Sequence, residues 1–282
     1  MPSGLNLPGP AILFCPADRP DRYEKALAAS DAVVFDLEDA VSPDQKDDAR
    51  ATLVEFLRGR TLAEVLVRIN PVTTPWFAED VKALRNTGVR IMLPKAENPQ
   101  TVAGLDQFEV LAICETPLGA VNAFELAKVE NTWAMLWGGE DMTAALAGRA
   151  TRRPDGSYMA SVNYLRAHVL IAAGAANKPA IDGAYLNIPD LEGLATETRE
   201  GVGMGFQAKI AIHPSQVAVI RENFAPSAEE LEWATAVLEA SKAEHGVFNF
   251  RGRMIDAPLL AQAEAYLAAA PATGAKLFRA GN

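Results

Sequence analysis

The chain has 282 residues, 49% of them apolar and 22% charged, and its 36 acidic and 26 basic side chains give a formal charge of -10. This length suits one large barrel or two average domains, and no apolar stretch reaches the roughly 18 residues of a membrane helix. The negative charge repels phosphodiester backbones and anionic lipid surfaces, so we expect neither a nucleic acid nor a membrane as a partner.

Eight short apolar or β-branched runs recur along the chain, and each is followed by a longer stretch of helical periodicity. We predict strands over residues 11–15, 32–36, 64–69, 89–93, 108–114, 132–137, 179–182 and 208–212. The runs lack polar alternation, so both of their faces are expected to be buried, as in a parallel sheet that helices cover. The sequence therefore predicts an α/β protein with a closed (β/α)8 TIM barrel.

Helix signals support this division of the chain. Pro117 and Pro214 each stand where a helix can begin just after a strand, and Ser227 with Glu230 forms a capping-box pattern. The wide gap before the seventh strand holds a polar loop over residues 149–158 and then a second helix, which we interpret as an insertion over one barrel mouth.

We predict that the residues after the eighth strand–helix unit form an extension separate from the barrel. A helix, the segment GVFNFRGRMIDAP and an Ala-rich helix over residues 259–270 follow the barrel. We therefore predict a barrel over residues 1–222 and a C-terminal helical extension over residues 223–282.

Cysteine usage and the N-terminus indicate a compartment. Cys15 and Cys114 both lie in apolar runs, and two thiols cannot form a disulfide framework in a chain of this length. Residues 1–14 lack the basic region and the long apolar core of a signal peptide. We expect a cytoplasmic protein with reduced cysteines.

Charged side chains collect at the predicted carboxyl ends of the strands, where a barrel places its catalytic groups. Glu115 and Asp141 follow adjacent strands, and two carboxylates with open positions for water and substrate suit magnesium, with manganese as an alternative. The three histidines are too scattered for a zinc site. The competing interpretation makes Asp141 the N-cap of a helix that begins near Met142, and Glu115 a solvated strand end.

Backbone and basic groups near the same mouth complete the candidate site. Gly138 and Gly139 allow a ligand to approach backbone N–H groups, although such pairs also simply form turns. Arg68 could clamp a substrate carboxylate or a developing enolate oxygen, or it could form an ion pair with Glu38 or Asp39. The basic residues after the first strand either form a solvated helix face or hold the phosphates of a nucleotide-like carrier; they are Arg19, Arg22 and Lys25.

Several other kinds of site have no support in the sequence. No G-x-S-x-G elbow is present for a nucleophilic triad, and no G-x-G-x-x-G follows a predicted strand. We interpret His213 as a residue that fixes a strand end, and both cysteines as small core residues.

Taken together, nine segments resemble the citrate lyase β-subunit-like branch of the HpcH/HpaI aldolase and citrate lyase superfamily. They span nearly the whole chain and are LFCPADRPDRYEKA (13–26), VVFDLEDAVSPDQKDDAR (33–50), VRINP (67–71), MLPKAE (92–97), ICETPLGA (113–120), WGGEDMTA (137–144), AIDGAYLNIPDLEGL (180–194), GFQAKIAIHPSQ (205–216) and MIDAP (254–258). The combination is specific, whereas each segment alone is not.

The resemblance implies a trimeric TIM-barrel lyase that uses magnesium to cleave or form a carbon–carbon bond beside a thioester. It assigns the metal to Glu115 and Asp141, substrate contact to Arg68, and, in the MID-x-P segment, a cap over a neighbouring subunit's site to Asp256. It also implies that the C-terminal extension packs on the barrel and on a neighbouring subunit, and that the basic residues after the first strand reach the carrier phosphates of coenzyme A.

These roles define an oxo-acid lyase that acts on a 3-hydroxyacyl thioester such as citramalyl-, malyl- or methylmalyl-CoA. Arg68 and the cation would offset the charge of the thioester enolate, and Asp256 would transfer a proton at its carbon. Glu38 and Asp39 would order Arg68 and water at the metal.

Three alternatives stay open at this point. The chain could be a citrate lyase β subunit that acts on citryl bound to an acyl carrier protein, or a non-catalytic CoA-binding subunit. A class II pyruvate aldolase is disfavoured, because DLEDAV stands where that group carries a histidine base after the second strand.

Overall fold

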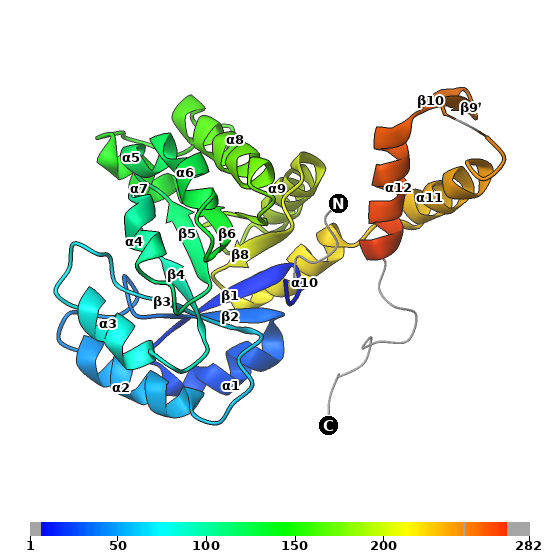
Figure 1. Ribbon diagram of the computed structural model, residues 1–282. Coiled ribbons are helices and arrows are strands. Elements are labelled where there is room, and N and C mark those ends of the chain that lie inside the picture. The colour runs from blue at the N-terminus through cyan, green and yellow to red at the C-terminus, as the bar shows by residue number, and fades with distance from the viewer. Residues whose placement is uncertain (1–6, 245, 270–282) are drawn as a thin grey trace. The chain divides into compact units, whose positions relative to one another are not determined.

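The structure, a computed structural model, describes residues 7–244 and 246–269. The described residues divide into two compact units, a larger one that ends at Arg221 and a smaller one that begins at Glu222 (Figure 1). Residues 1–6 of the predicted barrel and residues 270–282 of the predicted extension lie outside the described residues.

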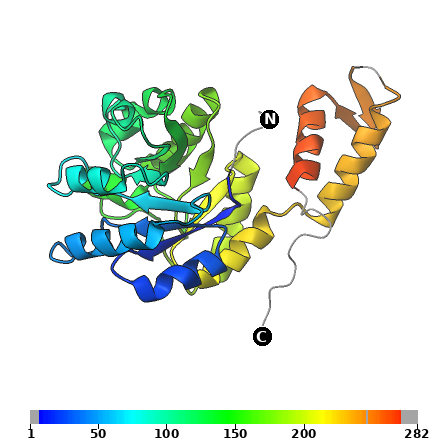
Figure 2. The same ribbon diagram turned by 60° about the horizontal axis from the view of Figure 1, so that its bottom comes forward.

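The larger unit is a closed barrel of eight parallel strands, each paired with the next in the chain and the last with the first. The strands are β1 Ala11–Pro16, β2 Ala32–Asp36, β3 Val65–Arg68, β4 Arg90–Leu93, β5 Val110–Cys114, β6 Thr132–Trp137, β7 Ala180–Asp182 and β8 Ala208–Ala211. Helices surround the strands (Figures 1 and 2). The (β/α)8 TIM barrel that the sequence predicts is therefore confirmed.

The barrel interior is filled by alternate strand residues. Its core contains Ile12, Val34, Leu66, Met92, Leu111, Leu136, Ile181 and Ile210, which are buried from water. The alternate positions face the helices, so the strands are buried on both sides and read as unbroken apolar runs. Parallel register sets Asp36 directly beside Arg68 at the carboxyl ends of β2 and β3.

The helices that follow the barrel strands come in chain order, and the last of them, α10, continues into the first residues of the smaller unit. They are α1 Pro20–Ala29, α2 Lys46–Leu57, α3 Phe77–Leu84, α4 Pro99–Ala103, α5 Pro117–Val121, α6 Ala123–Ala127, α7 Gly139–Ala145, α8 Ala160–Ala175, α9 Leu191–Met204 and α10 Pro214–Phe224. Pro117 and Pro214 begin helices as predicted, and Thr116 caps α5 by accepting a hydrogen bond from the Gly119 N–H.

The insertion before β7 is also present as predicted. Residues 149–158 form a loop closed by a bridge between Arg152 and Tyr158, and α8 follows it. The proposed N-cap role of Asp141 is wrong, because α7 begins at Gly139 with Gly138 as its N-cap. Asp141 lies inside the first helical turn, where its side chain is directed to the barrel mouth.

The smaller unit is a helical hairpin with a short two-stranded sheet between its helices. It contains α11 Ala228–Ala240, β9 Phe248–Phe250, β10 Arg253–Ile255 and α12 Ala257–Ala269. The capping box of Ser227 and Glu230 is confirmed. The sequence analysis missed the sheet, although Arg251 and Gly252 both have positive φ and form the two-residue turn typical of such hairpins.

Among the described residues, no helix has both the length and the hydropathy that a bilayer-spanning segment requires.

Candidate active site

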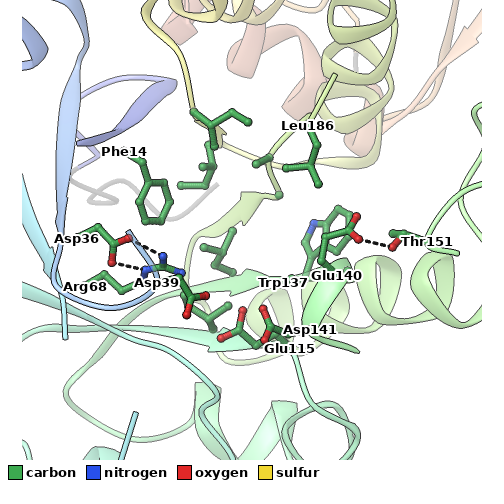
Figure 3. Close-up of a pocket in the computed structure, with 18 of the residues that line it drawn as sticks. Phe14, Asp36, Asp39, Arg68, Glu115, Trp137, Glu140, Asp141, Thr151 and Leu186 are labelled. Carbon is green, nitrogen blue, oxygen red and sulfur yellow. Dashed lines mark hydrogen bonds and ion pairs between the residues drawn. The ribbon is translucent and has the colours of Figure 1, made fainter. Parts of the chain in front are cut away.

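A pocket of about 500 Å³ opens at the carboxyl ends of the barrel strands. Charged groups from β2, β3, β5 and the start of α7 line one part of it, and apolar side chains from β1, β6 and β8 line another (Figure 3). The lining includes Phe14, Asp36, Asp39, Arg68, Glu115, Leu136, Trp137, Gly138, Gly139, Asp141, Leu186, Ile210 and Ile212. Most of the predicted site residues therefore meet in one cavity.

Arg68 is held rigidly at the wall of this pocket. Its Nε and Nη2 donate to the two carboxylate oxygens of Asp36, both at 2.7 Å, and its Nη1 lies 2.9 Å from Glu38 Oε2. The guanidinium also lies over the Phe14 ring, 4.8 Å from its centroid. Burial alone would lower the pKa of Arg68, but the hydrogen bonds and charge of Asp36 raise it, so the cation is permanent.

This arrangement confirms part of the predicted ion pairing and corrects the rest. Glu38 does contact Arg68, as one interpretation expected. The main partner, however, is Asp36, which the sequence analysis did not single out. Asp39 lines the pocket, and no ion pair joins it to Arg68 among the described residues.

Glu115 directly follows β5 and is only 4% exposed. Its Oε1 accepts a hydrogen bond of 2.8 Å from the Lys95 backbone N–H. Its Oε2 lies so close to Gly138 that a Cβ there would stand 2.6 Å away. Burial, followed by the nearby charge of Asp141, raises the pKa of Glu115 to about 7. The positive charge near this buried carboxylate does not offset its loss of hydration. A bound cation would stabilise the ionised form and lower its pKa.

Asp141 faces Glu115 across the same corner of the pocket (Figure 3). Its side chain is 37% exposed, so it can exchange solvent for a ligand at low cost. No cluster of three or more His, Cys, Asp or Glu side chains with metal-binding geometry occurs within the described residues. Glu115 and Asp141 both present carboxylate oxygens to the pocket, the ligand type that magnesium prefers.

Lys95, like Asp36, is a residue at this site to which the sequence analysis gave no role. Its Nζ lies 2.7 Å from Glu38 Oε1 and 3.2 Å from Asp141 Oδ1, while its backbone N–H holds Glu115. Its φ of 49° places it in the left-handed region. Its position in MLPKAE at the end of β4 was a visible signal, but the contacts depend on that unusual backbone.

Trp137 forms the opposite wall and is fixed from behind. Its Nε1 donates to Asp182 Oδ1 at 2.9 Å, and Asp182 also pairs with the buried cations Arg166 and Lys209 at 3.0 Å. Lys209 further contacts Glu197, which lies 2.7 Å from Arg152 of the inserted loop. The predicted insertion therefore contributes to the pocket wall and is tied to the barrel by a buried ionic network.

The remaining predicted residues lie outside this pocket lining. Arg19 pairs with Asp21 at the start of α1, and Arg22 and Lys25 are exposed on that helix. In the smaller unit, Asp256 precedes α12 and its Oδ1 accepts a hydrogen bond of 3.3 Å from the Leu259 N–H. The roles suggested for these four residues stay predictions.

Cys15 and Cys114 are free and buried, as predicted, and burial raises the pKa of both thiols. His213 is exposed at the end of β8, and its Nδ1 lies 2.8 Å from Ser215 Oγ at the start of α10. This contact is consistent with a role in fixing the strand end.

Two family models match the chain. The model described as HpcH/HpaI aldolase/citrate lyase covers residues 11–214, and the model described as a carbon–carbon bond lyase of the TIM-barrel fold covers residues 158–274. A citrate lyase subunit beta-like protein of Mycobacterium tuberculosis is 44% identical over 93% of this chain and 96% of its own length. The human mitochondrial citramalyl-CoA lyase is 32% identical over 92% of this chain and 84% of its own length.

Solved structures agree with these sequence relatives. The crystal structure of CitE from M. tuberculosis in complex with magnesium, acetoacetate and coenzyme A has a TM-score of 0.88 and 44% identity over 93% of this chain and 98% of that chain. Another crystal structure of CitE, with magnesium and pyruvate, has a TM-score of 0.81 and 39% identity over 94% of this chain and all of that chain.

The barrel, its charged mouth and these matches place the chain among the carbon–carbon lyases of the TIM-barrel fold. It belongs to the HpcH/HpaI aldolase/citrate lyase family, as the sequence motifs indicated.

Proposed function

We propose that this lyase cleaves or forms a 3-hydroxyacyl thioester such as citramalyl-, malyl- or methylmalyl-CoA with the help of magnesium. The observation that carries the proposal is the convergence of Glu115, Asp141 and Arg68 on one pocket at the carboxyl ends of the strands. Relatives named for citramalyl-CoA and malyl-CoA, and a solved relative with coenzyme A, support the choice of substrate class.

Glu115 and Asp141 would hold the magnesium ion. Their chemistry fits, because both are oxygen donors, and the raised pKa of Glu115 reflects a buried carboxylate that lacks sufficient positive charge. When bound, magnesium would supply Lewis-acid polarisation of the substrate's hydroxyl and carboxylate oxygens. Solved CitE structures that contain magnesium support the choice of this metal, and manganese has the same ligand preference.

Arg68 would bind the oxygen that becomes negative as the carbon–carbon bond breaks. Asp36 occupies two of the five N–H donors of Arg68, and Glu38 lies beside a third, on Nη1. One N–H on each terminal nitrogen would therefore be left for substrate. Because Asp36 and Glu38 fix the guanidinium, it needs little reorganisation during the reaction. A preorganised donor of this kind contributes about 3 to 4 kcal/mol in other enzymes.

The surrounding groups would position the substrate and exclude water. The backbone at Gly138 and Gly139 lines the pocket without side chains. The Gly138 N–H donates to the Cys114 carbonyl at 3.1 Å, so of these two glycines Gly139 would offer its N–H to a substrate carboxylate. Asp39 would order water beside the metal, and Glu38 would orient Arg68. The apolar wall would receive the alkyl part of the acyl group.

The carrier and the proton donor are assigned by resemblance to the family. We propose that Arg19, Arg22 and Lys25 bind the phosphates of coenzyme A, since Arg22 and Lys25 are exposed on α1 after the first strand. We propose that Asp256 transfers the proton at the enolate carbon in a neighbouring subunit's site. This assignment requires an oligomer, for which a homotrimer is our proposal, and the two free buried thiols suit a cytoplasmic location.

A panel of thioesters tests the proposal. Citramalyl-, malyl-, methylmalyl- and hydroxymethylglutaryl-CoA are incubated with the protein, with and without magnesium, and release of a keto acid or of acetyl- or propionyl-CoA is followed. Magnesium-dependent cleavage of at least one of them is expected. A parallel arm offers citryl bound to an acyl carrier protein, and exclusive turnover of that form would replace our substrate with the one expected of a citrate lyase β subunit. Magnesium binding without any cleavage would support a non-catalytic CoA-binding subunit instead.

A further inference from the structure

Lys95 occupies a backbone conformation that is unfavourable for a side-chain-bearing residue. Its φ of 49° lies in the left-handed region, where contacts of the Cβ make most residues other than glycine, asparagine and aspartate unstable. Glycine would make the same turn after β4 without this cost. The left-handed backbone at Lys95 accompanies a side chain that reaches Glu38 and Asp141.

That side chain contacts the charged groups that the proposed reaction uses. Its ammonium lies 2.7 Å from Glu38 Oε1 and 3.2 Å from Asp141 Oδ1, and the backbone N–H of the same residue donates to Glu115 Oε1 at 2.8 Å. One residue therefore joins both proposed metal ligands to the carboxylate that orients Arg68.

A fixed positive charge at this point has opposite effects on the two charged ligands. It repels a divalent cation and competes with that cation for Asp141. It also offsets the negative charge of the neighbouring carboxylates, which would otherwise repel an anionic keto acid. Both effects act over a few ångströms in a partly buried site, where charges interact strongly.

We propose that Lys95 is a positioning residue that sets the charge balance of the site, so that it weakens binding of the bare cation and strengthens binding of the anionic substrate. This inference rests on the proposed function. It predicts that the two affinities change in opposite directions when the charge is removed, which the loss of a purely structural contact would not produce.

The test compares Lys95→Met with Lys95→Arg and with Lys128→Met. Lys128 is a matched control, because it is an exposed lysine paired with Glu125 and it precedes β6, at the end of the barrel opposite the pocket. Calorimetric titration gives the dissociation constant for Mg²⁺ without substrate, and then that for pyruvate at saturating Mg²⁺. Pyruvate is the probe because a solved relative contains it together with magnesium.

Lys95→Met is expected to bind Mg²⁺ about tenfold more tightly and pyruvate about tenfold more weakly than the unmodified protein. Lys95→Arg and Lys128→Met are expected to retain both affinities. Lys95→Gly removes the side chain and relieves the backbone conformation, so it should show the affinities of Lys95→Met with equal or higher thermal stability. It keeps the test decisive if Lys95→Met fails to fold.

Weaker Mg²⁺ binding by both Lys95→Met and Lys95→Gly, or unchanged affinities in both, would overturn the inference about Lys95 and leave the proposed function intact. Absence of Mg²⁺ binding by the unmodified protein would overturn both.

Discussion

Glu115 and Asp141 differ in how tightly the surrounding protein encloses each side chain. Glu115 is enclosed by the Lys95 backbone and by Gly138, whereas Asp141 is more than one-third exposed at the start of α7. We therefore expect Glu115 to be the less replaceable ligand, because its oxygens are already held in position before a cation arrives.

Replacing either carboxylate tests the metal assignment. Glu115→Ala or Asp141→Ala should lower magnesium-dependent turnover by about a thousandfold or more, since several kcal/mol of charge stabilisation are lost. Thermal unfolding should show that both variants stay folded, because neither side chain belongs to the apolar core. Turnover that is unchanged in either variant would contradict the assignment of that residue.

The raised pKa of Glu115 predicts a pH dependence of metal binding. The carboxylate form binds the cation, so the affinity for Mg²⁺ should increase as the pH rises from 6 towards 8 and level off above the pKa of about 7. In the absence of metal, the free energy of unfolding should fall as the pH rises from 4.5 to about 7, because the folded state holds this proton more tightly than the unfolded state. Calorimetric titration in buffers of different ionisation enthalpy measures the released proton. Binding that is flat across this range would show that Glu115 is not a ligand.

Among the elements of the barrel, the N-cap residue of α7 packs closely against the residue that follows β5. A Cβ at Gly138 would stand 2.6 Å from Glu115 Oε2 and 2.9 Å from Glu115 Cβ. Gly138→Ala should therefore displace Glu115 and weaken Mg²⁺ binding by about tenfold or more, as measured by titration.

Gly174 provides a matched control for that substitution. It lies inside α8, and a Cβ there would have no neighbour within 4 Å. Gly174→Ala should leave Mg²⁺ binding unchanged and stabilise the helix by about 0.5 to 1 kcal/mol, which raises the melting temperature by about 2 °C. Equal Mg²⁺ affinities in the two variants would mean that the glycine at α7 has no role in the site.

The elements of the barrel could be predicted because each strand is buried on both faces and appears as an unbroken apolar run. The pairing of Asp36 with Arg68 could not, because it depends on the register of β2 against β3, which single strands do not encode. The position of Lys95 after β4 could be read from the sequence, but its contacts depend on its left-handed backbone, which no sequence pattern marks. The sheet of β9 and β10 was missed because three-residue strands are too short to show alternation.

In the whole molecule, Glu115 and Asp256 lie in different compact units, and this leads to a prediction about the assembled oligomer. If Asp256 serves a neighbouring subunit's site, a subunit with a defective metal site can still donate Asp256, and one with a defective Asp256 can still supply a metal site. Mixed oligomers of Glu115→Ala and Asp256→Asn should therefore recover activity that neither variant has alone.

Refolding the two variants together and assaying cleavage measures this recovery. The control mixes each variant with itself, which should leave the activity low. Failure of the mixture to exceed those controls, when mixed oligomers are shown to form, would place Asp256 in the site of its own chain or outside catalysis. Magnesium binding by Asp256→Asn alone should match that of the unmodified protein.

The ionic network behind Trp137 affects how the substrate range of this enzyme could be altered. Asp182, Arg166 and Lys209 are all buried, so a smaller residue at position 137 would leave a desolvated carboxylate short of a donor and weaken the whole fold. Leu186 and Ile212 line the same chamber and are not tied to that network, whereas Phe14 lies against the Arg68 guanidinium. A protein engineer who wishes to admit a bulkier acyl chain should begin with Leu186 and Ile212 and leave the indole in place.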